Sequence, residues 1–179
     1  MYRRIRHRRL SAVTNYRKRV ASLRGEMRRL VVRKSNRGIS VQIVEYEKSG
    51  DKVLASSNSK ELKGMGWEPR CNIPTAYLTG MLLGSKLKEK GSEYILDIGL
   101  YRPIKGSVIF AAAKGFSDCG QKLHNSIEFD EARLKGAHIA KYAAAEKGKT
   151  QFSTYAKAGF DAKAMEEKFE AVKKQLAGK

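Results

Sequence analysis

The sequence has few cysteines, few acids and no long apolar run. Its two cysteines, Cys71 and Cys119, are too few for a disulfide framework, and neither lies in a CxxC motif or at metal-ligand spacing from a histidine. We therefore expect two reduced thiols, with no structural metal and no cofactor. No stretch of about 18 apolar residues occurs, which argues against a membrane-spanning helix. The basic start is not followed by an apolar segment, so we expect no secretory signal.

Acidic residues are outnumbered two to one. The chain has 18 Asp and Glu against 37 Lys and Arg over 179 residues, a formal net charge of +19. Residues 1–37 hold 12 of the 15 arginines and a single acid, Glu26, and carry +13 of that charge. A guanidinium grips phosphate through two parallel hydrogen bonds and stacks on flat rings, whereas lysine is a hydrated point charge. This concentration predicts a polyanionic partner and favours nucleic acid.

An anionic membrane surface is the rival partner, because basic segments also bind anionic lipids. Such binding needs an amphipathic helix with bulky apolar residues. Residues 1–12 offer only Tyr2, Ile5, Leu10 and Ala12. We therefore expect no membrane partner, and a basic arm that stays disordered until it meets its anion.

A short helix is expected after the arm, over residues 14–30. Thr14 or Asn15 is placed to cap it, and Gly25 weakens or ends it. Apolar residues recur within it at spacings of three and four, at Val20, Leu23 and Met27.

Three β-rich runs follow, over Leu30–Asn36, Gly38–Tyr46 and Lys52–Ser57, with turn signals between them. In the second run apolar residues alternate with polar ones, which predicts one buried face. The pattern indicates an antiparallel meander.

The middle of the chain alternates helix and strand. Asn72-Ile73-Pro74 opens a helix that ends at Gly91, and Gly80 and Gly84 allow a neighbour to approach it closely. Tyr94–Leu100 is a near-continuous apolar run, typical of a central strand covered on both faces. Further elements are expected as a helix over Ser107–Gly120, a short strand near Leu123 and a helical segment over Glu131–Lys147.

The end of the chain has a different pattern. Within Asp161–Leu176 the apolar residues step by three and four, at Ala162, Met165, Phe169, Val172 and Leu176. Such a narrow stripe suits a single neighbouring surface. Residues 161–179 carry a net charge of only +1, so this helix should dock on the chain's own core or on a protein partner.

Together these elements predict an α/β fold with a mixed sheet. We divide the chain into an Arg-rich arm with a short helix (1–29), an α/β domain (30–140) and a helical C-terminal extension (141–179).

Three segments are candidates for nucleic-acid contact. Tyr16 lies between basic residues, where it either stacks on an unpaired base or packs on the core. The strand end Arg33-Lys34-Ser35-Asn36 joins cations to hydroxyl and amide groups, and is otherwise an ordinary polar turn. The loop 101–107, with Arg102 and Lys105, precedes a helix N-terminus that favours an anion, and is otherwise a plain connection.

Catalysis has little support in the sequence. Asp97 is the one acid in the apolar strand, and a nuclease would use it as a metal ligand. Two-metal phosphoryl transfer needs several converging carboxylates, so a hydrogen-bonded structural aspartate is the default. His7, His124 and His138 share no ligand spacing.

Many separate motifs resemble one family, the universal large-subunit ribosomal protein that binds 5S rRNA (the L-eighteen family), in its archaeal type. The resemblance covers roughly residues 3–140. It is carried by TNYRKR (14–19), RLVVRKSNRGISVQIV (29–44), GDKVLASSNSKEL (50–62), GW (66–67), NIPTAYLTGMLLG (72–84), ILDIGL (95–100) and KGSVIFAAAKG (105–115).

The resemblance implies RNase-H-like layers, no enzymatic activity, and a cytoplasmic place in the central protuberance of the large ribosomal subunit, tying 5S rRNA to large-subunit rRNA. It also implies neighbouring ribosomal proteins as partners. The apolar stripe of the helix 161–176, which lies outside the resemblance, is a candidate contact with one of them. The RNA-binding residues it implies are Arg3, Arg4, Arg6, Arg8, Arg9, Tyr16, Arg17, Arg19, Arg33, Ser35 and Asn36, with Arg102 and Lys105 as a weaker addition. An RNA-processing nuclease on the same fold and a DNA-compacting protein are the alternatives.

Overall fold

The computed structural model describes residues 7–11, 14–87, 91–124, 127–145 and 151–178. Its centre is a five-stranded mixed sheet in the order β3-β2-β1-β4-β5. The strands are β1 (Arg28–Lys34), β2 (Ile39–Glu47), β3 (Gly50–Asn58), β4 (Glu93–Asp97) and β5 (Lys122–Leu123). The first three pair antiparallel, while β1/β4 and β4/β5 are parallel. The predicted α/β class with an antiparallel meander is confirmed.

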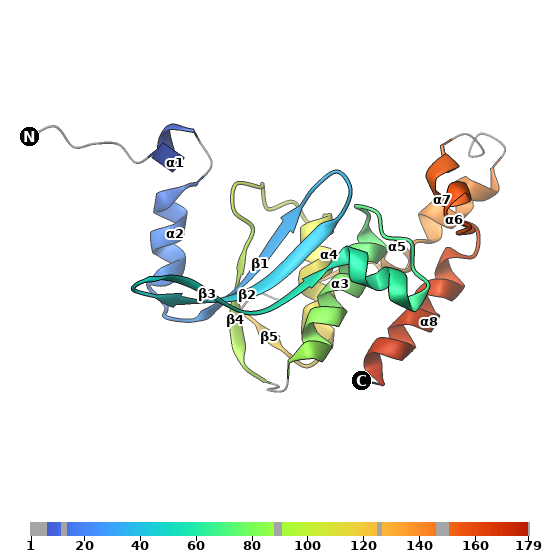
Figure 1. Ribbon diagram of the computed structural model, residues 1–179. Helices are drawn as coiled ribbons and strands as arrows, with labels where there is room; N and C mark the ends of the chain where they lie inside the picture. Colours follow the sequence, from blue (N-terminus) through green and yellow to red (C-terminus); the bar gives the residue numbers. More distant parts are fainter. Residues whose placement is uncertain (1–6, 12–13, 88–90, 125–126, 146–150, 179) are drawn as a thin grey trace, which may run out of the picture.

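The helices form layers on the two sides of the sheet (Figure 1). Helices α3 (Ile73–Lys86) and α4 (Val108–Asp118) cover one side, and α2 (Tyr16–Leu23) stands on the other, with the short α1 (His7–Leu10) at the end of α2 away from the sheet. Outside α3 lies a further layer of helices. Its members are α5 (Glu131–Lys135), α6 (Ala137–Ala144), α7 (Ser153–Lys157) and α8 (Met165–Ala177).

Helices α3 and α4 pack with almost no gap between their backbones. A Cβ atom on Gly80 would collide with the carbonyl oxygen of Ala112, and one on Gly115 would collide with the carbonyl oxygen of Tyr77. The expected close approach at Gly80 is therefore confirmed. At Gly84 a Cβ would lie 2.6 Å from the Cβ of Cys119, so the same face stays tight one turn later.

The C-terminal stripe is buried in the chain's own core. Met165, Phe169, Val172 and Leu176 are all at most 2% exposed. The ring of Phe169 lies 5.5 Å from that of Tyr77 on α3 and 6.4 Å from that of Trp67. Of the two alternatives for this helix, docking on the core holds. A protein contact through the stripe is wrong, because no apolar side of α8 is left for a partner.

Several sequence predictions differ from the structure at their boundaries. The helix expected to run to Gly91 ends at Lys86, because Leu87 turns to extended backbone. A 3-10 helix, η1 (Ser59–Met65), capped at both ends, follows β3 in a segment for which the sequence predicted no element. The helical segment predicted from residue 131 breaks at Gly136, which adopts a left-handed φ of 88° and separates α5 from α6.

The strand predicted over Tyr94–Leu100 is shorter and less covered than expected. Strand β4 ends at Asp97, and only Tyr94 among its residues is buried. Tyr94 packs edge-on against Phe116 of α4, with ring centroids 5.2 Å apart. Burial on both faces is therefore wrong: one face meets α3 and α4, and the other is partly open. None of the described helices has the length and apolarity needed to cross a membrane.

Candidate nucleic-acid interface

Strand β1 separates apolar from charged side chains on its two faces. Leu30 and Val32 are fully buried on the side of α3 and α4. Arg29 and Arg33 alternate with them, and therefore lie on the opposite face. Asp97 of β4 shares that face, because the parallel register sets it directly beside β1. The more open face of the sheet is thus charged.

An ion-pair network occupies this face. We call it the sheet network, and it consists of Arg19, Arg29, Arg33, Asp51 and Asp97. Arg29 is its centre: Nη1 lies 3.1 Å from Oδ2 of Asp97, and Nη2 lies 2.9 Å from Oδ2 of Asp51. Nη2 of Arg33 is 2.9 Å from Oδ1 of Asp97, and Nη2 of Arg19 is 2.9 Å from Oδ2 of Asp51. Three guanidiniums against two carboxylates leave the network one positive charge in excess.

Asp97 joins the sheet to the loop that follows β4. Its Oδ1 accepts the N–H of Gly99 at 2.8 Å, and its backbone carbonyl accepts Nη1 of Arg33 at 2.7 Å. Burial alone would raise the pKa of Asp97, but the hydrogen bond and charge of Arg33, the Gly99 N–H and the charge of Arg29 together lower it below its ordinary 3.8. The carboxylate is ionised at neutral pH.

The same geometry answers the nuclease hypothesis for Asp97. The carboxylates of Asp51 and Asp97 do converge, but on the guanidinium of Arg29, which fills the space where a metal ion would have to sit. Among the described residues no group of three or more His, Cys, Asp and Glu is arranged to hold a metal. The default reading of Asp97 as a structural, hydrogen-bonded aspartate agrees with this geometry.

Helix α2 is fixed to the sheet by charge and not by apolar packing. Asn15 caps it by accepting the N–H of Lys18 at 3.1 Å, which selects Asn15 over Thr14 as the cap. None of its residues is buried, and Val20 is 52% exposed. The Arg19–Asp51 pair ties α2 to β3. The apolar spacing seen in the sequence therefore does not mark a core-facing stripe.

A groove of about 600 Å³ separates α2 from the sheet. Lys18, Arg19 and Ser22 line it from α2, and Arg33 lines it from β1. The segment 96–101 closes the far wall with apolar side chains and the ring of Tyr101. Cations, a hydroxyl and a flat ring along one groove suit a nucleotide chain, in which phosphates alternate with bases.

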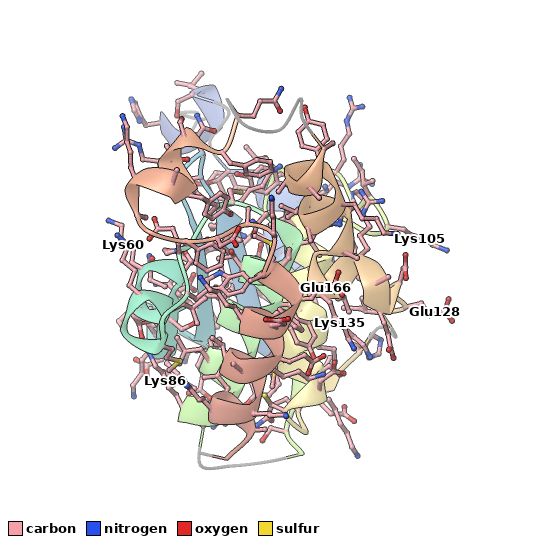
Figure 2. The ribbon with its side chains drawn as sticks, turned by 90° about the vertical axis from the view of Figure 1, so that its right-hand side faces the viewer. Lys60, Lys86, Lys105, Glu128, Lys135 and Glu166 are labelled. Carbon is pink, nitrogen blue, oxygen red and sulfur yellow. The ribbon has the colours of Figure 1, made fainter. Side chains whose placement is uncertain are left out.

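The ends of β1 and β4 form one basic edge, consisting of Lys34, Arg37, Arg102 and Lys105. The hydroxyl of Tyr101 donates to the backbone carbonyl of Lys34 at 2.8 Å, and Nζ of Lys34 lies 5.2 Å from the centre of the Tyr101 ring. Two segments 67 residues apart are thereby held together. Figure 2 shows Lys105 pointing away from the body of the molecule. The structure thus unites two of the candidate segments.

The turn at the end of β1 is rigid. The backbone N–H of Ser35 donates to the carbonyl of Gly38 at 2.8 Å, and the N–H of Gly38 donates to the Ser35 hydroxyl at 3.2 Å. Ser35 therefore shapes the turn, while Asn36 and Arg37 are exposed at its tip. At the other end of this edge, the Ser107 hydroxyl that begins α4 is buried with no hydrogen-bond partner among the described residues.

Tyr16 is the first residue of α2 and lies outside the core cluster. It lines a shallow outer surface of the helix together with Arg17, Val20 and Arg24. Core packing of Tyr16, one of the two readings of the sequence, does not occur. Tyr16 is partly buried beside Arg17 and Arg24, so stacking on a base stays a prediction.

The predicted arm lies mostly outside the described residues. Arg3, Arg4 and Arg6 are not described, and only the backbone of Arg8 and Arg9 is, within α1. The predicted contacts Arg19 and Arg33 are described and are held in the sheet network, though their side chains remain 35% and 42% exposed. They line the groove with fixed geometry and are not freely moving cations.

Sequence reasoning missed the centre of this arrangement. Arg29 was not singled out, although its alternation with Leu30 placed it off the core face. Asp51 lies between the second and third β-rich runs, and no sequence pattern marked it as a partner of Arg29. Tyr101, which fastens the basic edge, gave no signal beyond its place beside Arg102.

Comparisons with known proteins agree with one another. The family described as "Ribosomal large subunit proteins 60S L5, and 50S L18" matches residues 2–93. The large ribosomal subunit protein uL18 of the archaeon Methanococcus maripaludis is 41% identical over 178 residues, covering 94% of this chain and 92% of that protein. The family match includes α2 and β1–β3, which carry Arg19, Arg29, Arg33 and Asp51 of the sheet network, and it ends at the first residue of β4. The chain belongs to this family of large-subunit ribosomal proteins, a structural and non-enzymatic family.

Proposed function

We propose that the chain binds 5S rRNA and links it to large-subunit rRNA in the central protuberance. The observation that carries the proposal is the groove between α2 and the sheet. It joins Lys18 and Arg19 to Arg33 and the Tyr101 ring, and it continues into the basic edge. Single-stranded and irregular RNA is bound by such alternation of cations and flat rings.

The sheet network supports the proposal by fixing the cations before RNA arrives. A guanidinium already held by a carboxylate loses little side-chain entropy when it meets a phosphate. The proposed contacts fall into three groups. The first group belongs to the arm and consists of Arg3, Arg4, Arg6, Arg8 and Arg9. The second belongs to α2 and consists of Tyr16, Arg17 and Arg19. The third lies at the end of β1 and in the segments after β1 and β4, and consists of Arg33, Ser35, Asn36, Arg102 and Lys105.

Two basic surfaces are available to two RNA partners in this proposal. The groove lies between α2 and the sheet, whereas the basic edge lies at the strand ends and projects from the body, as Lys105 does in Figure 2. A protein that ties two RNAs together needs two such surfaces. We assign the groove, with α2 and the arm, to 5S rRNA and the basic edge to large-subunit rRNA.

The test is the affinity of the full chain for 5S rRNA at several salt concentrations, with duplex DNA as competitor. Each phosphate neutralised contributes a slope of about −0.7 to −0.9 in log affinity against log salt. We expect a steep slope, strong preference for 5S rRNA over the duplex, and a shallower slope when residues 1–12 are removed. Equal affinity for both nucleic acids would contradict the proposal.

A further inference from the structure

The guanidinium of Arg33 is held in place by the end of β4 and by its own strand. Its Nη1 donates to the carbonyl oxygens of Val32 at 2.9 Å and of Asp97 at 2.7 Å. Its Nη2 donates to Oδ1 of Asp97 at 2.9 Å. Within the described structure the guanidinium of Arg19, by comparison, is held by one carboxylate, that of Asp51. Arg33 therefore has a fixed orientation before any ligand binds.

These hydrogen bonds leave one edge of the Arg33 guanidinium unused. The group carries five N–H donors in a flat fork. Asp97 accepts one hydrogen from each Nη atom, and Val32 accepts the second hydrogen of Nη1. The two donors that remain are Nε–H and the second Nη2 hydrogen, which have no partner among the residues that the structure describes. We call this pair of donors the Arg33 edge. Because they point the same way, they can bind two oxygens of one acceptor group.

Gly99 keeps the Arg33 edge open. Its φ of 62° lies in the left-handed region, and its N–H donates to Oδ1 of Asp97 at 2.8 Å. A Cβ atom at this position would lie 3.0 Å from Cζ of Arg33, 3.1 Å from Nη2 and 3.3 Å from Nε. A side chain at residue 99 would therefore crowd the atoms that carry the two unused donors.

Exposure and charge decide which ligand the Arg33 edge suits. The side chain of Arg33 is 42% exposed, whereas that of Arg29 is 3% exposed. Arg33, Asp97 and Gly99 all line the groove, and Lys18 lines it from α2. The sheet network has one positive charge in excess, which favours an anion. A phosphodiester offers two unesterified oxygens and a negative charge, whereas the edge of a guanine base offers two acceptors without a charge.

We propose that the Arg33 edge binds one phosphate of the RNA chain through two parallel hydrogen bonds. Asp97 and Gly99 are positioning residues, because Asp97 fixes the orientation of the guanidinium and Gly99 leaves its edge uncovered. The inference rests on the proposed function, and it names the chemical group of the RNA that this part of the groove takes.

The first test compares Arg33→Lys with Arg133→Lys, a matched change at an exposed arginine of α5. Both variants keep the charge, but lysine cannot supply a bidentate fork. We expect Arg33→Lys to bind 5S rRNA about tenfold more weakly than the wild type. Arg133→Lys should bind within about twofold of the wild type.

Modified RNA separates a phosphate contact from a structural role. Single methylphosphonate linkages in 5S rRNA each remove the charge and one oxygen of one phosphate. At one linkage the modification should weaken binding of the wild type and of Arg133→Lys about tenfold, and should hardly affect Arg33→Lys. A purely structural loss in Arg33→Lys would leave the same phosphates important in all three proteins, which would overturn the inference. Coupling of Arg33 to a 7-deazaguanine in place of a methylphosphonate would overturn it as well.

A second measurement does not need 5S rRNA. The Nε–H resonance of Arg33 is followed by NMR while a short oligouridylate, which has phosphates and no guanine, is added to the full chain. The resonance should move in the wild type, and by less than about half as much in Gly99→Asn, which keeps the charge and tolerates a left-handed φ. No movement in the wild type, or equal movement in both proteins, would overturn the inference.

The two tests also separate this inference from the proposed function. If the wild type shows no preference for 5S rRNA while the Arg33 resonance still moves with oligouridylate, the 5S proposal falls and the phosphate contact stands. If 5S rRNA binds as proposed and no phosphate couples to Arg33, the phosphate contact falls alone.

Discussion

Helices α2 and α8 use opposite chemistry in the same fold. Helix α2 has no buried residue, three cations in its eight residues and no acid. Helix α8 buries four apolar residues, and its three acids balance its three lysines. Figure 2 shows the same mixture on the layer of C-terminal helices, where Lys135 lies near Glu166. Helix α2 is held to the sheet by an arginine–aspartate pair, and α8 is held against α3 by its buried apolar stripe.

The two helices therefore have different roles: α8 stabilises the fold, and α2 supplies side chains for binding. Apolar burial of about 25 cal/mol per Å² makes α8 part of the core, so its loss should unfold the chain. Helix α2 buries little apolar surface, so its side chains are not needed for the core and can serve to bind a polyanion. Changes in α8 should therefore alter stability, and changes in α2 should alter RNA affinity.

Phe169→Ala should have the largest effect on stability. It removes a ring that is 1% exposed and contacts both Trp67 and Tyr77. Loss of about 3–5 kcal/mol in the free energy of unfolding is expected from the cavity left behind. Urea denaturation measures it, with Val20→Ala of α2 as the matched control. A comparable loss in the control would erase the contrast between the helices.

Asp97→Asn should have the next largest effect on stability. The free energy of unfolding should fall by up to about 3 kcal/mol, because Arg29 and Arg33 keep their charges and lose a shared carboxylate. The pKa of Asp97 is depressed in the fold. The carboxylate therefore contributes fully to stability at any pH above the pKa that Asp97 has in the unfolded chain. This contribution is lost as the pH falls through the lower pKa that Asp97 has in the folded chain.

The pH dependence checks that assignment. The difference in unfolding free energy between the wild type and Asp97→Asn should stay constant from neutral pH to about pH 5 and shrink below about pH 4. A difference that grows on acidification would mean that the carboxylate is not the stabilising species.

Tyr16→Ala examines α2 from the binding side. If the ring stacks on a base, RNA binding should weaken by roughly 1–3 kcal/mol. Stability should hardly change, since Tyr16 is outside the core cluster. Filter binding and thermal melting give the two readouts. Tyr16→Phe keeps the stacking ring and should bind RNA like the wild type. Weak RNA binding by that variant would mean that the hydroxyl, and not the ring, makes the contact.

Tyr101→Phe should give the smallest effect. It deletes the hydrogen bond to the Lys34 carbonyl and keeps the ring near the Lys34 ammonium. A loss of about 0.5–1.5 kcal/mol in stability is expected. Hydrogen exchange at the end of β1 and in the loop 101–107 should accelerate in the same variant. Unchanged exchange would show that the basic edge holds together without this bond.

The sequence predicts those parts of the fold that depend on local patterns. The meander follows from alternation between Leu30 and Ser57, and the α8 stripe from five residues at helical spacing. Both are properties of neighbouring residues, so periodicity is enough. The boundaries differ where a single residue leaves the pattern, as at Leu87 and Gly136.

The sheet network was beyond such reasoning because its partners are far apart in the chain. Arg29 and Asp97 are separated by 68 residues and meet only because β4 pairs in parallel with β1. Alternation placed Arg29 on the face away from the core but gave no partner for it. Arg19 and Arg33 could be predicted as cations of the interface, whereas their fixed geometry could not.

The salt dependence of 5S rRNA binding tests the central contrast most directly. Two triple variants remove equal charge from exposed positions. One changes Arg17 and Lys18 of α2 and its C-cap Arg24 to Gln, and the other changes Lys157, Lys163 and Lys174 of the C-terminal layer to Gln. The first should reduce the slope of log affinity against log salt by about 2, and the second should leave it nearly unchanged. Equal reductions in both would contradict the account, because binding would then follow net charge and not the α2 side of the sheet.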